Sequence, residues 1–241
     1  MPWWGSMEMP EGKVEEVKFG LYGQQLAEQN ALKGPFDPSK PESLALLKKR
    51  ADGNDPDAIL AMAVIYYSGW GVQKNAAQAM KYIDKVKNYH GARLLRGVIL
   101  YEGAPGVTKN QVNAYKELEQ SAYFLYFLDN SKRSLKALFD RSKDKYTEVI
   151  TNKACRYLGI CYEKGIGVTG NLNTAIAIWL KNSTDAESIY KLGYYTEHGR
   201  YRTVFVRGVQ KPNYNLAREF YRMATDLGHA QAKAALQRLG N

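Results

Sequence analysis

The chain has 241 residues, a formal net charge of +10, 45% hydrophobic residues and 24% charged residues. These proportions are those of a globular protein and exclude a chain that is disordered throughout. No apolar run reaches the roughly 18 residues of a membrane span, and the N-terminal residues contain no apolar leader segment. We therefore expect a cytoplasmic protein, or a periplasmic one if a leader peptide has been removed, whose charge favours acidic partners.

We predict an N-terminal extension over residues 1–40, followed by a repeat domain over residues 41–241. A glycine-rich turn recurs four times in that domain. Its copies are GWGVQKN from Gly69, GAPGVTKN from Gly103, GIGVTGN from Gly165 and RGVQKPN ending at Asn213. An upstream small residue recurs at positions 58, 92, 154 and 188, at intervals of 34, 62 and 34 residues. The long middle interval indicates an insert near 123–150.

Each copy is predicted to be a pair of helices joined by the glycine-rich turn. A small residue six positions before the turn glycine lets a neighbouring helix approach closely. The asparagine after the turn is expected to cap the second helix, and a valine within the turn to fill the gap between the helices. The small residues are Ala63, Gly97, Gly159 and Gly193, the asparagines Asn75, Asn110, Asn171 and Asn213, and the valines Val72, Val107, Val168 and Val209.

The third turn contains a literal G-x-G-x-x-G, from Gly165 to Gly170. A dinucleotide-binding fingerprint requires a preceding strand and a role for all three glycines. Here the preceding segment has a helical pattern, and the third glycine is a lysine, Lys74 or Lys109, in the first two copies. We therefore interpret the motif as a structural turn and expect no bound cofactor.

The combined pattern of small residues, glycines, valine and asparagine resembles the Sel-one-like repeat family, whose members are related to tetratricopeptide repeats. The resemblance covers repeats near 57–88, 91–122, 153–184 and 187–228, with a closing cap helix over 229–240. It implies an all-α fold, a right-handed α-α superhelix of helical hairpins, with the extra helical insert near 123–150. It further implies a non-enzymatic protein-binding module, such as a bacterial adaptor or an immunity protein that neutralises a secreted toxin or effector.

In such repeats the first helices line the concave side, so a protein-binding groove is predicted from three positions of each first helix. These positions are Leu60, Val64 and Tyr67; Leu94, Val98 and Tyr101; Arg156, Ile160 and Glu163; and Tyr190, Tyr194 and Glu197. Tyrosines are favoured anchors at protein interfaces. The alternative is that these side chains pack under the N-terminal arm, which includes Leu26, or under the insert.

Two basic clusters are predicted to attract an acidic partner protein. Their defining residues are Lys132, Arg133 and Lys136 in the insert, and Arg200, Arg202 and Arg207 in the fourth copy. Both clusters would equally suit an ordinary solvated face. The segment 200–207 alternates like a strand and is expected to form a hairpin-like flap, whose edge a partner could bind.

Two other functions are weighed against protein binding. The charge would also suit a nucleic-acid-binding helical repeat, but no polar side chain recurs on the groove face as a reader of bases requires. An enzyme would need clustered titratable groups, and the three histidines carry no catalytic or metal-binding motif. Cys155 and Cys161 fall in the packing pattern of a first helix, so we expect buried thiols.

Overall fold

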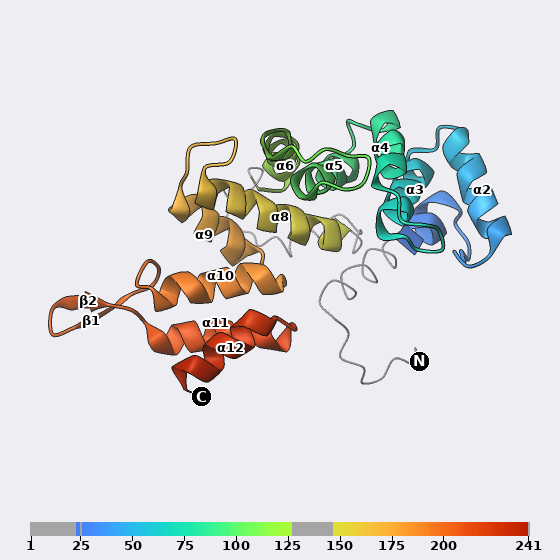
Figure 1. Cartoon of the computed structure of the whole chain (residues 1–241). Coiled ribbons are helices and arrows are strands. Elements are labelled where there is room, and N and C mark those ends of the chain that lie inside the picture. The colour runs from blue at the N-terminus through green and yellow to red at the C-terminus, as the bar shows by residue number, and fades with distance from the viewer. Residues whose placement is uncertain (1–22, 25, 127–146, 241) are drawn as a thin grey trace. The chain divides into compact units, whose positions relative to one another are not determined.

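The computed structural model describes residues 23–24, 26–126 and 147–240, and in this part of the chain nearly all regular structure is helical (Figure 1). The chain divides into two compact units. One comprises residues 1–110 with 145–150, and the other comprises residues 111–144 with 151–241. Among the described residues no helix is both long and apolar enough to cross a bilayer. The fold class is therefore the predicted all-α one, built from helical hairpins.

The N-terminal unit is built around one almost completely buried helix. Its elements are η1 (Leu26–Ala31), α2 (Pro41–Asp52), α3 (Pro56–Ser68), α4 (Ala76–Lys85) and α5 (His90–Glu102). Helix α3 contacts η1, α2 and α4, and it is apolar around most of its circumference, as a helix covered on several sides must be. Asp55 caps it by accepting hydrogen bonds from the backbone N–H groups of Asp57 and Ala58.

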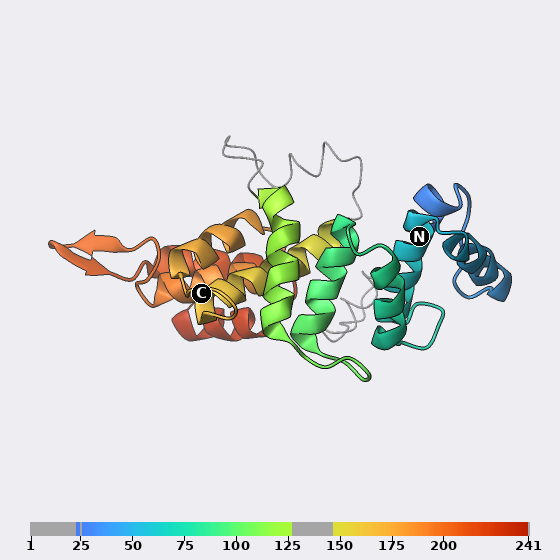
Figure 2. The same ribbon diagram turned by 90° about the horizontal axis from the view of Figure 1, so that it is seen from above.

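The C-terminal unit contains the third and fourth repeats and the cap helix. Its elements are α6 (Gln111–Tyr126), most of α8 (Thr147–Lys164), α9 (Leu172–Lys181), α10 (Ala186–Glu197), β1 (Val204–Val206), β2 (Val209–Lys211), α11 (Tyr214–Asp226) and α12 (Ala230–Leu239). Helix α10 packs against both α9 and α11, and α12 closes the stack on α11 (Figure 2). Each added helix buries the apolar face that its predecessor leaves open.

Small residues permit close packing where the repeat pattern predicts it. A Cβ added at Gly159 would lie 2.1 Å from Nε1 of Trp179, and one added at Gly193 would lie 2.7 Å from Cε1 of Tyr221. Trp179 and Tyr221 are among the largest fully buried side chains. The aromatic ring of each second helix therefore occupies the space left by the missing side chain on its first helix.

The predicted turn glycines and three of the four predicted asparagine caps are confirmed. Gly165 and Gly167 have φ of 69° and 71°, the left-handed region that favours glycine. The side-chain oxygens of Asn75, Asn171 and Asn213 accept hydrogen bonds from the backbone N–H three residues on. The G-x-G-x-x-G motif thus joins helix α8 to helix α9, without the preceding strand that a dinucleotide site requires.

The fourth copy departs from the others at its turn. The predicted flap is confirmed as an antiparallel hairpin, in which Val204 pairs with Lys211 and Val206 pairs with Val209. The expectation that Val209 fills the gap between helices is wrong, because it lies in β2 and is 57% exposed. The inserted residues pair with this valine and carry it away from the helices. Most of the predicted insert, residues 127–146, lies outside the described residues.

Candidate functional site

The predicted groove positions of the N-terminal unit are covered by the chain itself. Leu60, Val64, Leu94 and Val98 are all buried. A Cβ at Gly23 would lie only 3.2 Å from Cγ1 of Val64, so Gly23 lies directly against this face of α3. A partner could reach Val64 only after Gly23 moved.

The last predicted groove position of each copy is matched with a cation. In the first two copies it is a tyrosine, and the turn lysine lies over its ring. The ammonium of Lys74 is 5.8 Å from the ring centre of Tyr67, and that of Lys109 is 5.9 Å from the ring centre of Tyr101. The hydroxyl of Tyr67 also donates to Glu102 at 2.7 Å, so it is already engaged within the unit.

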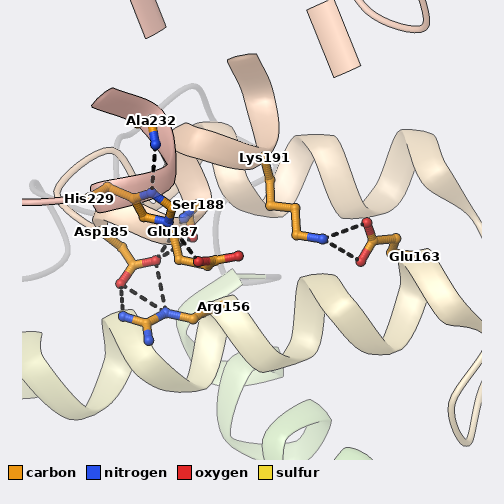
Figure 3. A network of polar contacts seen from close by, with 8 residues as sticks. All are labelled: Arg156, Glu163, Asp185, Glu187, Ser188, Lys191, His229 and Ala232. Carbon is orange, nitrogen blue, oxygen red and sulfur yellow. Dashed lines mark hydrogen bonds and ion pairs between the residues drawn. The ribbon is translucent and has the colours of Figure 1, made fainter. Parts of the chain in front are cut away.

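In the third copy the same position is a glutamate, and its cation comes from the next repeat. Glu163 Oε1 accepts from Lys191 Nζ at 2.9 Å (Figure 3). It also accepts from the Tyr195 hydroxyl at 2.6 Å. Gly170 stands where the first two copies have a lysine, so the tyrosine and its lysine are replaced together. The contact joins α8 to α10 and explains why Glu163 is largely buried.

Two further polar contacts join α8 to the start of α10 and α10 to the start of α12 (Figure 3). Arg156 forms an ion pair with Asp185, the residue that caps α10. His229 caps α12 by accepting from the Ala232 N–H at Nδ1, while its Nε2 lies 2.8 Å from Glu187. Both ring nitrogens are therefore occupied and the side chain is 3% exposed, which leaves His229 unsuited to act as a general base.

Glu197 forms the corresponding contact in the fourth copy. It is buried, pairs with Arg238 of α12 and accepts from the Tyr221 hydroxyl at 2.6 Å. Burial opposes its ionisation, but the hydrogen bonds from Arg238 and Tyr221 and the Arg238 charge outweigh that effect, so the pKa of Glu197 lies below its ordinary value. Burial also opposes the ionisation of Glu187, but the hydrogen bond and charge of His229 outweigh that effect and lower the pKa of Glu187.

The remaining predicted groove residues differ in exposure. Ile160 packs on the cluster around Trp179, and Tyr190 stacks on His229 with ring centres 4.4 Å apart. Tyr194 is 40% exposed. Of the predicted groove positions, Tyr194 is therefore the one whose ring is exposed and open to a partner.

Tyr194 belongs to a continuous exposed surface at the end of α10. Its ring contacts those of His198 and Tyr195 at 4.1 Å and 5.3 Å between centres, and the Arg200 guanidinium lies 5.7 Å from the Tyr195 ring centre. We call the exposed residues Tyr194, His198 and Arg200 the α10 end surface; Tyr195 is buried and supports the Tyr194 ring from below. Sequence reasoning missed His198, although its spacing of four residues from Tyr194 places both on one helix face.

The predicted basic patch is only partly described. Lys132, Arg133 and Lys136 lie outside the described residues. Arg200, Arg202 and Arg207 are all exposed; Arg200 belongs to the α10 end surface, and Arg202 and Arg207 follow it along the chain. Between Glu197 and Glu219 the sequence contains five arginine and lysine residues and no carboxylate, so this stretch concentrates positive charge.

The two cysteines are placed as expected. Both are buried, and burial raises the pKa of each thiol to about 12. At neutral pH they are protonated, which suits packing rather than nucleophilic attack.

Comparison with known proteins identifies the repeats. The model of the Sel1 repeat matches residues 56–85, 92–123, 152–181 and 186–229, more than half of the chain. The chain belongs to the Sel1 repeat family, as the sequence motifs predict. Proteins of this family are generally protein–protein interaction modules and typically non-catalytic scaffolds.

Solved structures of similar proteins come from bacteria. A Sel1 repeat protein from Oxalobacter formigenes is 23% identical, with a TM-score of 0.57 over 96% of this chain and 84% of its own, and shares the fold. A protective antigen with an SLR fold from uropathogenic Escherichia coli, c5321, is 19% identical, with a TM-score of 0.42 over 95% of this chain and 49% of its own. A Sel1 repeat protein from Klebsiella pneumoniae is 14% identical, with a TM-score of 0.44 over 96% and 95%. No curated protein matches the chain.

Proposed function

We propose that this chain is a bacterial adaptor or immunity protein that binds one acidic protein, such as a secreted toxin or effector, and does not itself catalyse a reaction. The observation that carries the proposal is the exposed run of positive charge that follows Tyr194 in the fourth repeat. Four exposed cations, Arg200, Arg202, Arg207 and Lys211, have no carboxylate between them in the sequence. Next to an exposed aromatic ring, they combine long-range attraction with a contact anchor.

The α10 end surface supplies the anchor of this proposed interface. Tyr194 rests on Tyr195, whose hydroxyl is held by Glu163, so the exposed ring lies on a rigid base. A preordered side chain loses little conformational freedom when a partner covers it. The adjoining arginines would speed encounter with an acidic surface, and this effect would weaken as salt screens the charges.

The proposal is tested by affinity capture with the full chain, compared with Tyr194→Ala and Arg200→Ala variants. We expect one acidic protein to be retained at low salt and largely lost at high salt, with each variant weakening retention about tenfold. Tyr89→Ala is the matched control, because Tyr89 is an exposed tyrosine of the N-terminal unit. Equal retention by all four proteins would refute this interface.

The same positive charge would also suit a nucleic acid, so a gel-shift with RNA and duplex DNA at two salt concentrations belongs to the test. A nucleic-acid-binding repeat would bind tightly with a steep salt dependence. We expect only weak binding, since in the described first helices the exposed tyrosine of the α10 end surface does not recur at the other groove positions, as a series of stacking sites would require.

A further inference from the structure

The hairpin of the fourth repeat extends away from helices α10 and α11 in both views of the molecule (Figures 1 and 2). Its turn is formed by Arg207 and Gly208, with φ of 53° and 77°. Positive φ at both central residues is the geometry that continues the natural twist of a two-stranded ribbon. A Cβ added at Gly208 would meet no atom within 4 Å, so the tip is open to solvent.

Each face of this ribbon carries an exposed apolar side chain. Val206 and Val209 are paired and lie on one face, where they are 43% and 57% exposed. Phe205 is adjacent in the strand and therefore lies on the other face, where it is 74% exposed. Exposing such side chains on both sides of a short hairpin gives no packing energy to the free protein.

The base of the hairpin, in contrast, is fixed to the unit. The ring of Tyr201 packs on the cluster around Trp179 and lies 6.4 Å from that of Phe220, measured between centres. Across the base, the side chain of Gln210 donates to Thr203 at 2.7 Å. The ribbon is thus held in one direction by its base, and a partner that covered its tip would not have to order it first.

The charged side chains of the hairpin are all cations. Arg202, Arg207 and Lys211 are exposed, and in the described ranges the side chains of Arg207 and Lys211 form no hydrogen bond or ion pair. Like charges would oppose the pairing of two copies of this ribbon, so the charge argues against a second copy as the occupant. A nucleic acid would meet the cations but would leave the valines without apolar contact.

We propose that the hairpin inserts into a cleft of an acidic partner protein, with apolar walls against both faces of the ribbon and carboxylates around the cations. A flat surface covers one face of a ribbon, whereas a cleft covers two. Protein clefts are lined mainly by apolar side chains with a few polar groups at defined positions, which matches the hairpin's pattern. This inference rests on the proposed function and adds the mode of binding to it.

Photocrosslinking from the two faces tests the insertion. The full chain would carry p-benzoylphenylalanine in place of Phe205, Val209, Tyr194 or Leu46, the last an exposed control in the N-terminal unit. After irradiation in lysate of the source organism, the crosslinked peptides are mapped by mass spectrometry. We expect positions 205 and 209 to label two different segments of the same protein, each with aspartate or glutamate nearby, and position 46 to label neither.

Several outcomes would overturn the insertion. They are labelling from only one face, labelling of another copy of this chain, labelling of nucleic acid, or labelling no stronger than at position 46. If position 194 labels an acidic protein while positions 205 and 209 do not, the insertion alone fails and the proposed function stands. If none of the three labels a protein, both fail.

A matched pair of variants then measures how much the charge of Arg207 contributes to binding, while the turn is preserved. Asparagine and aspartate both accept positive φ, so Arg207→Asn and Arg207→Asp keep the hairpin while removing or reversing the charge. Against the crosslinked partner, we expect Arg207→Asp to weaken binding about tenfold more than Arg207→Asn, mainly through slower association.

A second pair of variants tests the apolar side chains. Phe205→Ser and Val209→Ser should each weaken binding about tenfold with an unchanged thermal unfolding curve. Equal affinities for these variants and the parent chain would overturn the proposal.

Discussion

The hydroxyl of Tyr221 donates to Oε2 of Glu197 at 2.6 Å, while the Tyr221 ring lies over the bare backbone of Gly193. One side chain of α11 thus fills the small-residue position of α10 and satisfies the buried carboxylate at its end. Arg238 completes the contact from α12, at 2.5 Å and 2.9 Å from the two carboxylate oxygens. The carboxylate of Glu197 thus joins helices α10, α11 and α12.

Removing the hydroxyl alone should destabilise the protein measurably. In Tyr221→Phe the ring still packs on Gly193, but Glu197 loses one of its hydrogen bonds in a buried setting. We expect a loss of about 1.5 kcal/mol in the free energy of unfolding, measured by urea titration followed by circular dichroism. Tyr214→Phe, at an exposed tyrosine of the same helix, should change it by less than about 0.5 kcal/mol. Equal effects at the two positions would contradict the assigned role of Glu197.

Stability should fall in acid because of Glu187 and Glu197. The pKa of each is lowered in the folded protein from the ordinary value of 4.5, so the unfolded chain binds protons more readily. Their contribution is complete above that ordinary value and is lost as the pH falls through the folded pKa. Unfolding free energies measured from pH 6 to pH 3 should therefore decline below about pH 4.5. Glu197→Gln should flatten this decline; a slope as steep as that of the parent chain would assign the acid sensitivity to other groups.

The close approach of helices predicts which glycines tolerate a methyl group. Gly193→Ala would place a Cβ 2.7 Å from Tyr221, and we expect a loss of about 2 kcal/mol because the ring cannot shift freely in a packed core. Gly170→Ala is the control, since its Cβ would meet its nearest neighbour at an ordinary 3.6 Å. The melting temperatures of the two variants measure the difference between these stability losses. A large loss at Gly170 would reopen the question of its role in the G-x-G-x-x-G turn.

The asparagine caps give a local test of the repeat. Asn171 Oδ1 accepts from the Thr174 N–H at 3.1 Å at the start of α9. Asn171→Ala should cost about 1 kcal/mol of unfolding free energy, while Asn171→Asp should retain most of the stability, because a carboxylate caps equally well. Thermal unfolding of both variants measures the difference, and an alanine variant as stable as the parent would show that the cap contributes nothing.

Most structural residues that the sequence predicts correctly have local interactions; the small packing residues Gly159 and Gly193 are also predicted, because they recur from copy to copy. The caps Asn75, Asn171 and Asn213 act on a backbone N–H three residues away, and the turn glycines act through their own φ. The flap at 204–211 follows from strand alternation on either side of a two-residue turn. Such signals lie within a few residues and recur from copy to copy, so a single sequence is enough to detect them.

The candidate site was less predictable, because exposure depends on residues far along the chain. Glu163 and Glu197 have groove spacing, yet their partners Lys191 and Arg238 lie 28 and 41 residues away. Helical periodicity gives the direction of a side chain but not what the next repeat places against it. The sequence by itself determined the helical hairpins, their caps and the family. Only the tertiary structure decided which groove side chains hold neighbouring helices together and left Tyr194 and the hairpin exposed, because burial is a property of packed helices and not of any one of them.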